Sequence, residues 1–501
     1  MTEKREDKLR QLKGRLAQIS DVSSANGLLM WDKQTYMPKG GVAGRAEQTA
    51  TLSRIAHEML VDAETERLLN ALDLPDPTSE DDALVRRARR EYEKATRLPG
   101  ELVAEISRAT VLAEHAWAEA RARSGWSLFA PHLEKILPLQ REAAEHLGYE
   151  DHPYDALLDG YEPGAKKARL ERMFEELKAG LVPLIRSISE RDGEDREAPL
   201  HGAFDEAAQE RFGEEVITRF GYDWERGRQD RTVHPFCIGL TSGDVRITTR
   251  FDPRWLSPAL FGTMHETGHA LYEQGVNPAY ARTPLGGGTS MGVHESQSRL
   301  WENLVGRSRP FWYHFYPGLQ EVFPEALGGV EAEEFYRAIN VVSPSEIRVE
   351  ADEVTYNLHI LLRFELEVAL IEGSLPVSDL PSAWNAKMEE YLGVTPENDA
   401  EGALQDVHWS AGLFGYFPTY TIGNVLSVQL FDEAVSTYPA IPEQIAEGEF
   451  SSLLDWLREN IHRHGSRYYP DELIQHVTGR PLDTAPYLEY LKRKFGELYE
   501  L

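Results

Sequence analysis

Apolar residues recur at helical spacing along most of this 501-residue chain. Near the start, Leu12, Leu16 and Ile19 fall on one side of a helix. Long charged segments keep the same period, which is typical of amphipathic helices with solvated outer faces. Residues 233–251 differ, because β-branched and aromatic residues flank a Thr-Ser-Gly-Asp turn there. The sequence therefore predicts a mainly α-helical protein with a small β-hairpin or sheet element near 233–251.

The chain is long enough for several domains, but it contains no segment that reads as a linker. No Gly/Ser-rich or Pro-rich stretch is long enough to separate autonomous domains, and no repeat of about 20–50 residues is visible. We expect a single domain over residues 1–501. Its N-terminal helical part covers about 1–230, and a second part covers about 231–501.

Charge and cysteine content narrow the function classes. A net charge of −30 repels phosphate backbones, so we expect no nucleic-acid partner. No apolar run reaches the roughly 18–20 residues of a membrane span, so we expect no membrane partner. The N-terminus is charged and lacks an apolar signal core, and the lone Cys237 cannot form an internal disulfide. We therefore expect a cytoplasmic protein.

Residues 257–275 read as one helix with marked ends. Ser257 suits the N-cap, Pro258 suits the first helical position and Gly275 suits the C-cap. The segment contains the run His-Glu-Thr-Gly-His, which matches the pattern H-E-x-x-H. That pattern carries chemistry only on a helix, and the end signals predict this context.

His265 and His269 project from one face of this helix, one turn apart, so their imidazoles can bind the same metal ion. Glu266 lies beside the first ligand and can act as the general base for a water that the metal activates. This pattern predicts a metallopeptidase with one metal ion per chain. Zn²⁺ is the default ion, and Co²⁺ or Mn²⁺ could substitute for it.

The third metal ligand narrows the class further. In metzincins a third histidine would stand where this chain has Gly275, so that class is excluded. We expect a carboxylate from a second helix instead. Glu295, which follows the flexible 286–288 glycine run, would complete a His/His/Glu site with an open position for water. His294 and Glu302 remain alternatives.

Several short segments beyond the metal motif resemble the signatures of one family, the Taq-type metallocarboxypeptidases of bacteria, archaea and some protists. They follow the order in which that family has them and cover nearly the whole chain. The segments are Trp31–Gly41, Arg45–Gln48, Asp244–Thr248, His294–Gln297, Ile347–Asp352, Gly402–Trp409 and Phe414–Asn424. One small departure is Lys33, where the family pattern has Gln or Glu.

The resemblance implies a mainly α-helical fold with two lobes around a deep cleft, related to neurolysin-like and angiotensin-converting-enzyme-like peptidases. It implies a zinc carboxypeptidase that releases single amino acids from peptide C-termini, with broad side-chain preference and poor action next to proline. It also implies a homodimer.

A carboxypeptidase must bind the free C-terminal carboxylate of its substrate and stabilise the oxyanion that forms at the scissile carbonyl. A guanidinium suits the first task, because its planar fork pairs with both carboxylate oxygens. Arg348 is our first candidate and Arg246 the second. A neutral hydrogen-bond donor suits the second task. His408 and Tyr420 fit it by type, and Tyr416 is an alternative.

Each ligand histidine also needs an acceptor for its second ring N–H. Four residues could supply one, and the sequence does not choose among them. They are Gln297, Asp244, Asp352 and Glu302.

The sequence favours a carboxypeptidase over three other functions. A zinc endo-oligopeptidase on the same fold is the main alternative, since it keeps the metal site without needing a carboxylate-binding arginine; the matches around Arg348 and His408 favour the carboxypeptidase. An aminopeptidase is disfavoured because no G-x-M-E-N-like element is present. A non-enzymatic helical scaffold would have no need of Glu266.

Overall fold

Helices form most of the computed structural model, which describes residues 2–76, 78–191 and 196–501. Within these residues the only sheet has three strands. This confirms the prediction of a mainly α-helical fold with a small β element. The chain forms two compact units, and each unit is assembled from three separate segments.

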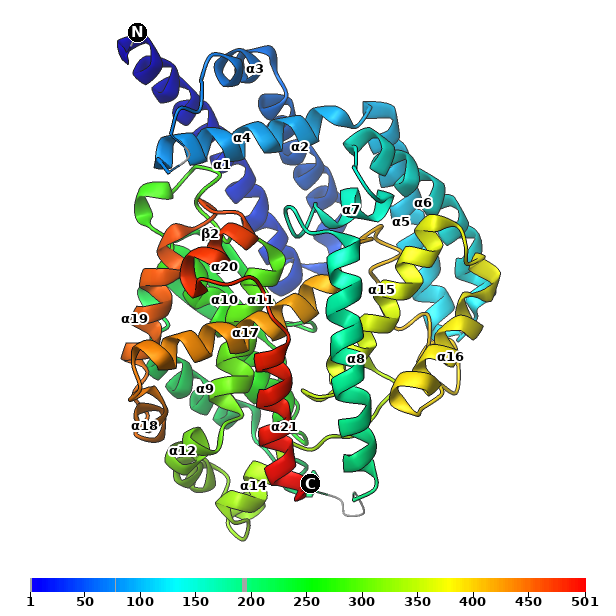
Figure 1. The fold of residues 1–501 in the computed structure, drawn as a ribbon, viewed down its shortest axis with the longest axis vertical. Helices are drawn as coiled ribbons and strands as arrows, with labels where there is room; N and C mark the ends of the chain where they lie inside the picture. Colours follow the sequence, from blue (N-terminus) through cyan, green and yellow to red (C-terminus); the bar gives the residue numbers. More distant parts are fainter. Residues whose placement is uncertain (1, 77, 192–195) are drawn as a thin grey trace. The chain divides into compact units, whose positions relative to one another are not determined.

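The first unit comprises residues 1–96, 196–339 and 430–481. Leu12 and Leu16 are buried in an apolar cluster that joins the first helix to the third and fourth, and Ile19 packs against it. The helices α1 and α2 lie side by side (Figure 1). The helices of this unit are α1 (Thr2–Thr35), α2 (Val42–Leu60), α3 (Ala63–Asn70), α4 (Glu80–Arg97), α9 (Glu206–Phe220), α10 (Ser257–Gly275), α11 (Met291–Arg299), α12 (Arg309–Val322), α13 (Pro324–Leu327), α14 (Ala332–Ala338), α18 (Ile441–Ala446), α19 (Ser451–Asn460) and α20 (Pro470–Thr478).

The sheet has the order β1-β3-β2, with β1 (Gly227–Arg231), β2 (Cys237–Thr241) and β3 (Asp244–Thr249). Strands β2 and β3 form the predicted antiparallel hairpin. Strand β1 pairs with β3 in parallel and was not predicted, because Gly-Arg-Gln-Asp-Arg has none of the β-branched or aromatic residues that mark a strand. Thr249 at the end of β3 bonds Thr263 of α10 at 2.9 Å, which fixes the sheet against that helix.

Helix α10 spans the predicted residues, but its ends differ from the prediction. Ser257 is the first helical residue; Leu256 is the N-cap, and no side chain caps the helix there. Gly275 is the last helical residue and does not adopt a left-handed C-cap conformation. Glycine is required at this position for another reason: a Cβ at Gly275 would lie 2.6 Å from the ring of His462.

The second unit comprises residues 97–195, 340–429 and 482–501. Helix α15 lies at its centre and packs against α6, α7, α8 and α16. Nearly all of its residues are buried, as expected for a helix that is apolar around most of its circumference. The helices of this unit are α5 (Gly100–Ala122), α6 (Trp126–Leu147), α7 (Pro153–Leu158), α8 (Lys167–Ser189), α15 (Tyr356–Glu372), α16 (Leu380–Leu392), α21 (Ala485–Tyr499) and α17 (Pro418–Thr437) as far as residue 429.

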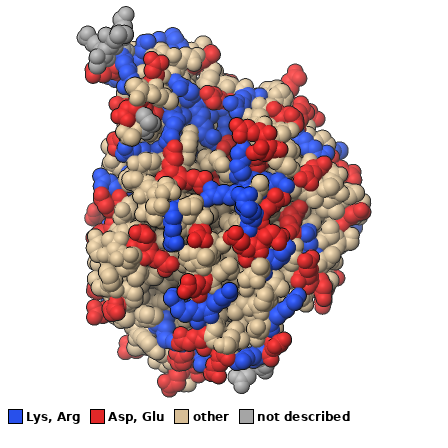
Figure 2. Space-filling view, viewed as in Figure 1, with Lys and Arg blue, Asp and Glu red and all other residues tan. Residues whose placement is uncertain are grey.

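None of the helices in the described ranges has the length and apolarity needed to span a bilayer. Acidic and basic side chains are interspersed over the face shown in Figure 2.

Candidate active site

Helices α10 and α11 bring the three predicted metal ligands together. The Nε2 atoms of His265 and His269 lie 3.6 and 3.4 Å from Oε2 of Glu295. One ligand atom of each of these three residues lies within 4.8 Å of the ligand atoms of the other two. The described residues contain no other such group. Two imidazoles and one carboxylate at this spacing suit a divalent ion of the zinc type. The residues therefore fit the metal that the motif predicts.

Gly268 allows the two helices to approach this closely. A Cβ at this position would lie 2.5 Å from the backbone oxygen of Gln297 and 2.6 Å from Cα of Ser298, both on α11. Because backbone atoms cannot move aside as a flexible side chain can, any side chain here would push α11 and Glu295 away from His269.

We expect Gly268→Ala to lower the free energy of unfolding by about 1–3 kcal/mol, the usual cost of overpacking, and to weaken metal binding. Thermal unfolding and chelator competition would measure the two effects. Gly262→Ala is the matched control, since a Cβ there meets nothing within 4 Å. Equal behaviour of the two variants would show that the close approach at Gly268 does not matter.

Glu302 holds His265, the first of the predicted metal ligands. Its Oε2 lies 2.9 Å from Nδ1 of His265, so among the four acceptor candidates it is the one that contacts a ligand histidine. It belongs to a π-helical segment (Leu300–Gly306) that continues α11, and such segments are frequent at functional sites. Burial opposes ionisation of Glu302, but Arg299 and His265 outweigh it and lower its pKa to about 2.

Arg299 joins two carboxylates of this site. Its Nε donates to Glu295 at 2.7 Å, and its Nη1 donates to Glu302 at 3.3 Å. Although burial alone would raise it, the pKa of Glu295 is held well below its usual range by Arg299 and the two ligand histidines. Glu295 is therefore an anion, as a metal ligand must be.

Glu266 is buried and its Oε2 has no hydrogen-bond partner among the described residues. Burial raises the pKa of this carboxyl to about 7 in the metal-free protein. A bound divalent cation would lower it, because positive charge favours the carboxylate. An unpartnered buried carboxylate next to a metal ligand can accept a proton from a reacting water.

The remaining candidates of the first unit have other partners. His294, the alternative third ligand, lies behind His269 with the two Nδ1 atoms 2.6 Å apart. Gln297 bonds to His462 at 2.9 Å. Arg246 makes two bonds to Asp244, at 2.7 and 2.8 Å, and its guanidinium stacks on the ring of Trp31 at 4.4 Å.

The second unit contains a buried ionic cluster of Arg348, Arg363 and Asp406, which we call the Asp406 cluster. Nη2 of Arg348 and Nε of Arg363 bond to Asp406 at 2.6 and 2.7 Å. Arg348 is 5% exposed and Arg363 is fully buried. Burial opposes ionisation of Asp406, but the two arginines outweigh it and hold its pKa far below the usual range. Gln405 ties the cluster together by accepting from Arg348 N and from Arg363.

His408 and Tyr420 lie beside this cluster. His408 Nε2 is 3.3 Å from the hydroxyl of Tyr420, and Arg348 stacks on the ring of Tyr420 at 5.0 Å. Burial lowers the pKa of His408 to about 4, so its ring is neutral at pH 7. Tyr416, the alternative donor, packs against His408 with ring centroids 5.3 Å apart. Asp352 accepts hydrogen bonds from Val354 N and Thr355 N, which lie just before α15.

Glu367 of α15 anchors the segment that carries His408. It accepts hydrogen bonds from Trp409 Nε1 at 2.9 Å, Tyr154 Oη at 2.7 Å and Gly415 N at 3.0 Å. Burial raises the pKa of Glu367 from 4.5 to about 7, and the three hydrogen bonds only partly offset it.

This buried carboxyl gives unfolding a pH dependence. Between about pH 4.5 and 7 the native state retains a proton that the unfolded state has released, so the free energy of unfolding falls as pH rises. The slope of one such proton is at most about 1.4 kcal/mol per pH unit. We expect Glu367→Gln to lose this slope across the window, measured by denaturant unfolding at several pH values. Parallel curves for wild type and variant would contradict the assignment.

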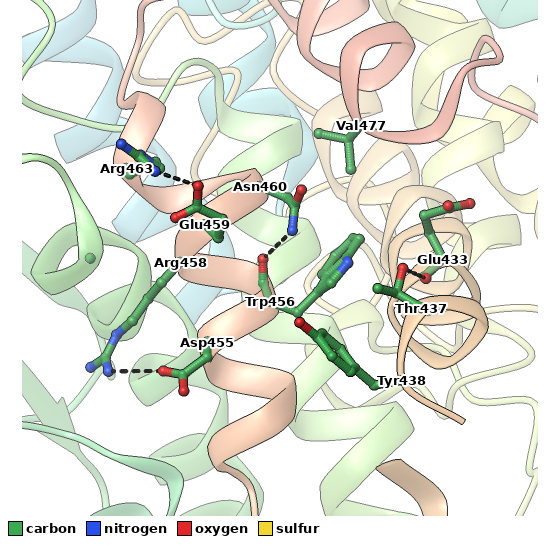
Figure 3. A pocket seen from close by; sticks show the side chains of 11 residues that line it. Glu433, Thr437, Tyr438, Asp455, Trp456, Arg458, Glu459, Asn460, Arg463 and Val477 are labelled. Carbon is green, nitrogen blue, oxygen red and sulfur yellow. Dashed lines mark hydrogen bonds and ion pairs between the residues drawn. The ribbon is translucent and has the colours of Figure 1, made fainter. Parts of the chain in front are cut away.

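A separate hollow in the first unit lies beside α19 and the end of α17, with a volume of about 740 Å³ (Figure 3). Trp456 and Tyr438 line it together with polar side chains that pair with one another. Arg458 lies 3.9 Å from Asp455, and Arg463 pairs with Glu459. The hollow contains none of the predicted site residues.

Sequence reasoning missed four residues that the site uses. Glu273, whose Oε1 lies 2.8 Å from Nε2 of His294, follows His269 at the i+4 spacing that places His265 and His269 on one face. Arg299 follows Glu295 at the same spacing, so helical periodicity could have found both. Arg363 and Asp406 are far apart in sequence, and only the fold brings them together.

The comparisons with known proteins agree with this chemistry. The family model described as "Carboxypeptidase Taq (M32) metallopeptidase" matches residues 11–495. Thermostable carboxypeptidase 1 of Thermus thermophilus is 46% identical over 95% of this chain and 96% of its own length. Carboxypeptidase 1 of Bacillus subtilis is 41% identical over 97% of each. The crystal structure of an M32 carboxypeptidase from Deinococcus radiodurans matches 99% of this chain and 100% of its own, with 45% identity and a TM-score of 0.96.

The endo-oligopeptidase alternative is not favoured, since the curated relatives that match the full chain are named as carboxypeptidases. A His/His/Glu metal site, a buried carboxylate suited to general-base work and a family match over nearly all residues lead to one conclusion: the chain belongs to the carboxypeptidase Taq (M32) family and is a metallocarboxypeptidase.

Proposed function

We propose that this metallocarboxypeptidase uses zinc, held by His265, His269 and Glu295, to release single amino acids from the free C-termini of peptides with broad side-chain preference. The observation that carries the proposal is the compact donor set on α10 and α11, with the unpartnered Oε2 of Glu266 next to it. Cobalt or manganese fits the same donors, and zinc is the default for two histidines and a carboxylate.

A bound zinc ion would supply Lewis acidity to the site. The residues of the chain do the rest. Glu266 accepts the proton of the attacking water and then passes it to the nitrogen of the leaving amino acid, as a general base that becomes a general acid. Glu302 keeps His265 oriented through Nδ1, and Arg299 keeps Glu295 and Glu302 ionised.

Arg348 is proposed to bind the substrate's C-terminal carboxylate. The Asp406 cluster contains two guanidinium groups and one carboxylate, so it carries one excess positive charge. His408 beside it is neutral at pH 7 and does not change this sum. A buried excess charge is unfavourable, and a carboxylate from the substrate would neutralise it. Arg348 retains the small exposure that Arg363 lacks. Arg246, which is already paired with Asp244, is the second candidate.

His408 and Tyr420 are proposed to stabilise the oxyanion. Both are hydrogen-bond donors when neutral, and burial keeps the His408 ring neutral. In their contact at 3.3 Å one side chain donates to the other, and a Tyr420 hydroxyl that accepts from His408 can still donate its own proton to an oxyanion.

One peptide in two forms, with a free and with an amidated C-terminus, tests the proposal. We expect mass spectrometry to show stepwise loss of C-terminal residues from the free acid only. Arg348→Met should raise KM for the free acid about 10- to 100-fold, the value of a charge-assisted hydrogen bond, and reduce discrimination against the amide. Arg246→Met is the matched comparison, and a larger effect there would transfer the role to Arg246. Internal cleavage of both forms would contradict the carboxypeptidase proposal.

We further propose that the chain acts as one catalytic domain, in the cytoplasm, as a homodimer. The single cysteine and the absence of a membrane-spanning helix in the described ranges are compatible with that location. The family resemblance is the basis for the dimer. Sedimentation equilibrium would test it, and a mass of about one chain, 56.7 kDa, would contradict it.

A further inference from the structure

Two more polar side chains, those of His294 and Glu273, continue the hydrogen bonding of His269 on the side of the ring away from Nε2. Nδ1 of His269 lies 2.6 Å from Nδ1 of His294, and Nε2 of His294 lies 2.8 Å from Oε1 of Glu273. Glu273 Oε1 also accepts from the backbone N of Gly288 at 3.2 Å. The three side chains form a line within the first unit, which we call the His294 relay.

Hydrogen-bond chemistry determines where each proton in this line lies. Nε2 of His269 must be bare to bind a metal, so Nδ1 carries the ring proton and donates to Nδ1 of His294. Nδ1 of His294 is then an acceptor, so its own proton lies on Nε2 and is donated to Glu273. A carboxylate accepts only, so it ends the line and excludes the opposite arrangement.

We propose that His294 and Glu273 are positioning residues that hold His269 in the tautomer and orientation required for metal binding. The inference rests on the proposed role of His269 as a ligand. A ligand histidine usually donates its second N–H to a carboxylate, carbonyl or water. His265 follows this rule through Glu302, whereas His269 reaches its carboxylate through a second imidazole.

Two glycines make room for the relay. A Cβ at Gly288 would lie 2.7 Å from the ring of His294, and a Cβ at Gly239 of strand β2 would lie 2.9 Å from Oε2 of Glu273. Tyr272 packs on His294 with ring centroids 5.1 Å apart. The surrounding backbone is thus shaped to the two side chains, which an incidental contact would not require.

Two substitutions at His294 separate positioning from packing. Asn places its side-chain oxygen close to where Nδ1 of His294 stands, so His294→Asn keeps the acceptor for His269. His294→Leu removes it. We expect His294→Leu to weaken zinc binding about 10- to 100-fold in chelator competition, and His294→Asn to bind within about threefold of wild type.

The tautomer of His269 gives a readout that packing alone would not move. In the metal-free wild type Oε2 of Glu295 lies 3.4 Å from Nε2 of His269 and competes for the ring proton, but the contact of Nδ1 with His294 is shorter, at 2.6 Å. ¹⁵N–¹H correlation of labelled histidines should therefore show the His269 proton on Nδ1 and the His294 proton on Nε2. His294→Leu should leave His269 in a mixture of both tautomers, and Glu273→Leu should do the same to His294. Thermal unfolding of the metal-free variants identifies any variant that fails to fold. If a variant fails to fold, the tautomers of His269 and His294 in the wild type test the inference.

Three results would overturn the inference: zinc binding by His294→Leu as tight as wild type, zinc binding by His294→Asn as weak as His294→Leu, or a proton on Nε2 of His269 in the wild type. Failure of the proposed function looks different. In that case the wild type would release no C-terminal residues, while the order of zinc affinities among the variants would still hold.

Discussion

Glu266→Gln is expected to lower kcat for C-terminal release by about 10²–10⁴-fold, the usual contribution of a general base. Glutamine has the shape of glutamate but cannot accept the proton of the attacking water. Because Glu266 is not among the three residues whose ligand atoms converge, zinc content should remain at one ion per chain. Steady-state kinetics with metal analysis on the same preparations would measure both.

The matched control is Glu433→Gln, the same chemical change in the same unit, at the hollow beside α19. It should leave kcat unchanged. If Glu266→Gln kept wild-type kcat with its metal bound, Glu266 would not be the base. If it lost its metal, the variant would report on metal binding, and the proposed ligand set of His265, His269 and Glu295 would be incomplete.

Asp406→Asn is expected to destabilise the protein by about 3–5 kcal/mol, the usual cost of removing one partner from a buried ion pair. Asp406 is the one carboxylate bonded to both Arg348 and Arg363, so its loss leaves two buried guanidinium groups without a counter-charge. Denaturant unfolding at neutral pH would measure the change.

Asp244→Asn is the control for this prediction. Asp244 also pairs with an arginine, Arg246, but its side chain is 39% exposed, so solvent screens the pair and the expected loss is about 0–1 kcal/mol. Similar losses for the two variants would mean that the Asp406 cluster is not the buried charge centre described above.

The helical fold was predictable because its signals are local. Apolar spacing placed Leu12 and Leu16 in a core, and the turn within 233–251 predicted the β2–β3 hairpin. Strand β1 was not predictable, because its own sequence has no local preference for a strand. It is a strand because it pairs with β3. The prediction of Gly275 as the C-cap of α10 was wrong. Glycine is needed there because His462, nearly two hundred residues away in sequence, packs against it, and a rule about helix ends does not contain such contacts.

The candidate site likewise contains residues that the local sequence predicts and residues that only the fold brings together. His265, Glu266 and His269 follow from one helical turn, and Glu295 follows from the need for a carboxylate. The partner of His269 is an imidazole, which no rule on acceptor type would have selected before the structure placed His294 there. Arg348 was selected by residue type, whereas the excess positive charge of the Asp406 cluster, in which two arginines share one carboxylate, depends on contacts that the sequence does not encode locally.

Anomalous diffraction at the zinc absorption edge, from crystals grown with zinc, tests the metal assignment most directly. We expect one anomalous peak per chain, bonded to Nε2 of His265, Nε2 of His269 and the carboxylate of Glu295, with zinc–nitrogen distances of about 2.0–2.1 Å. A peak bonded to other residues, or no peak in crystals of active protein, would contradict the assignment on which the catalytic role of Glu266 depends.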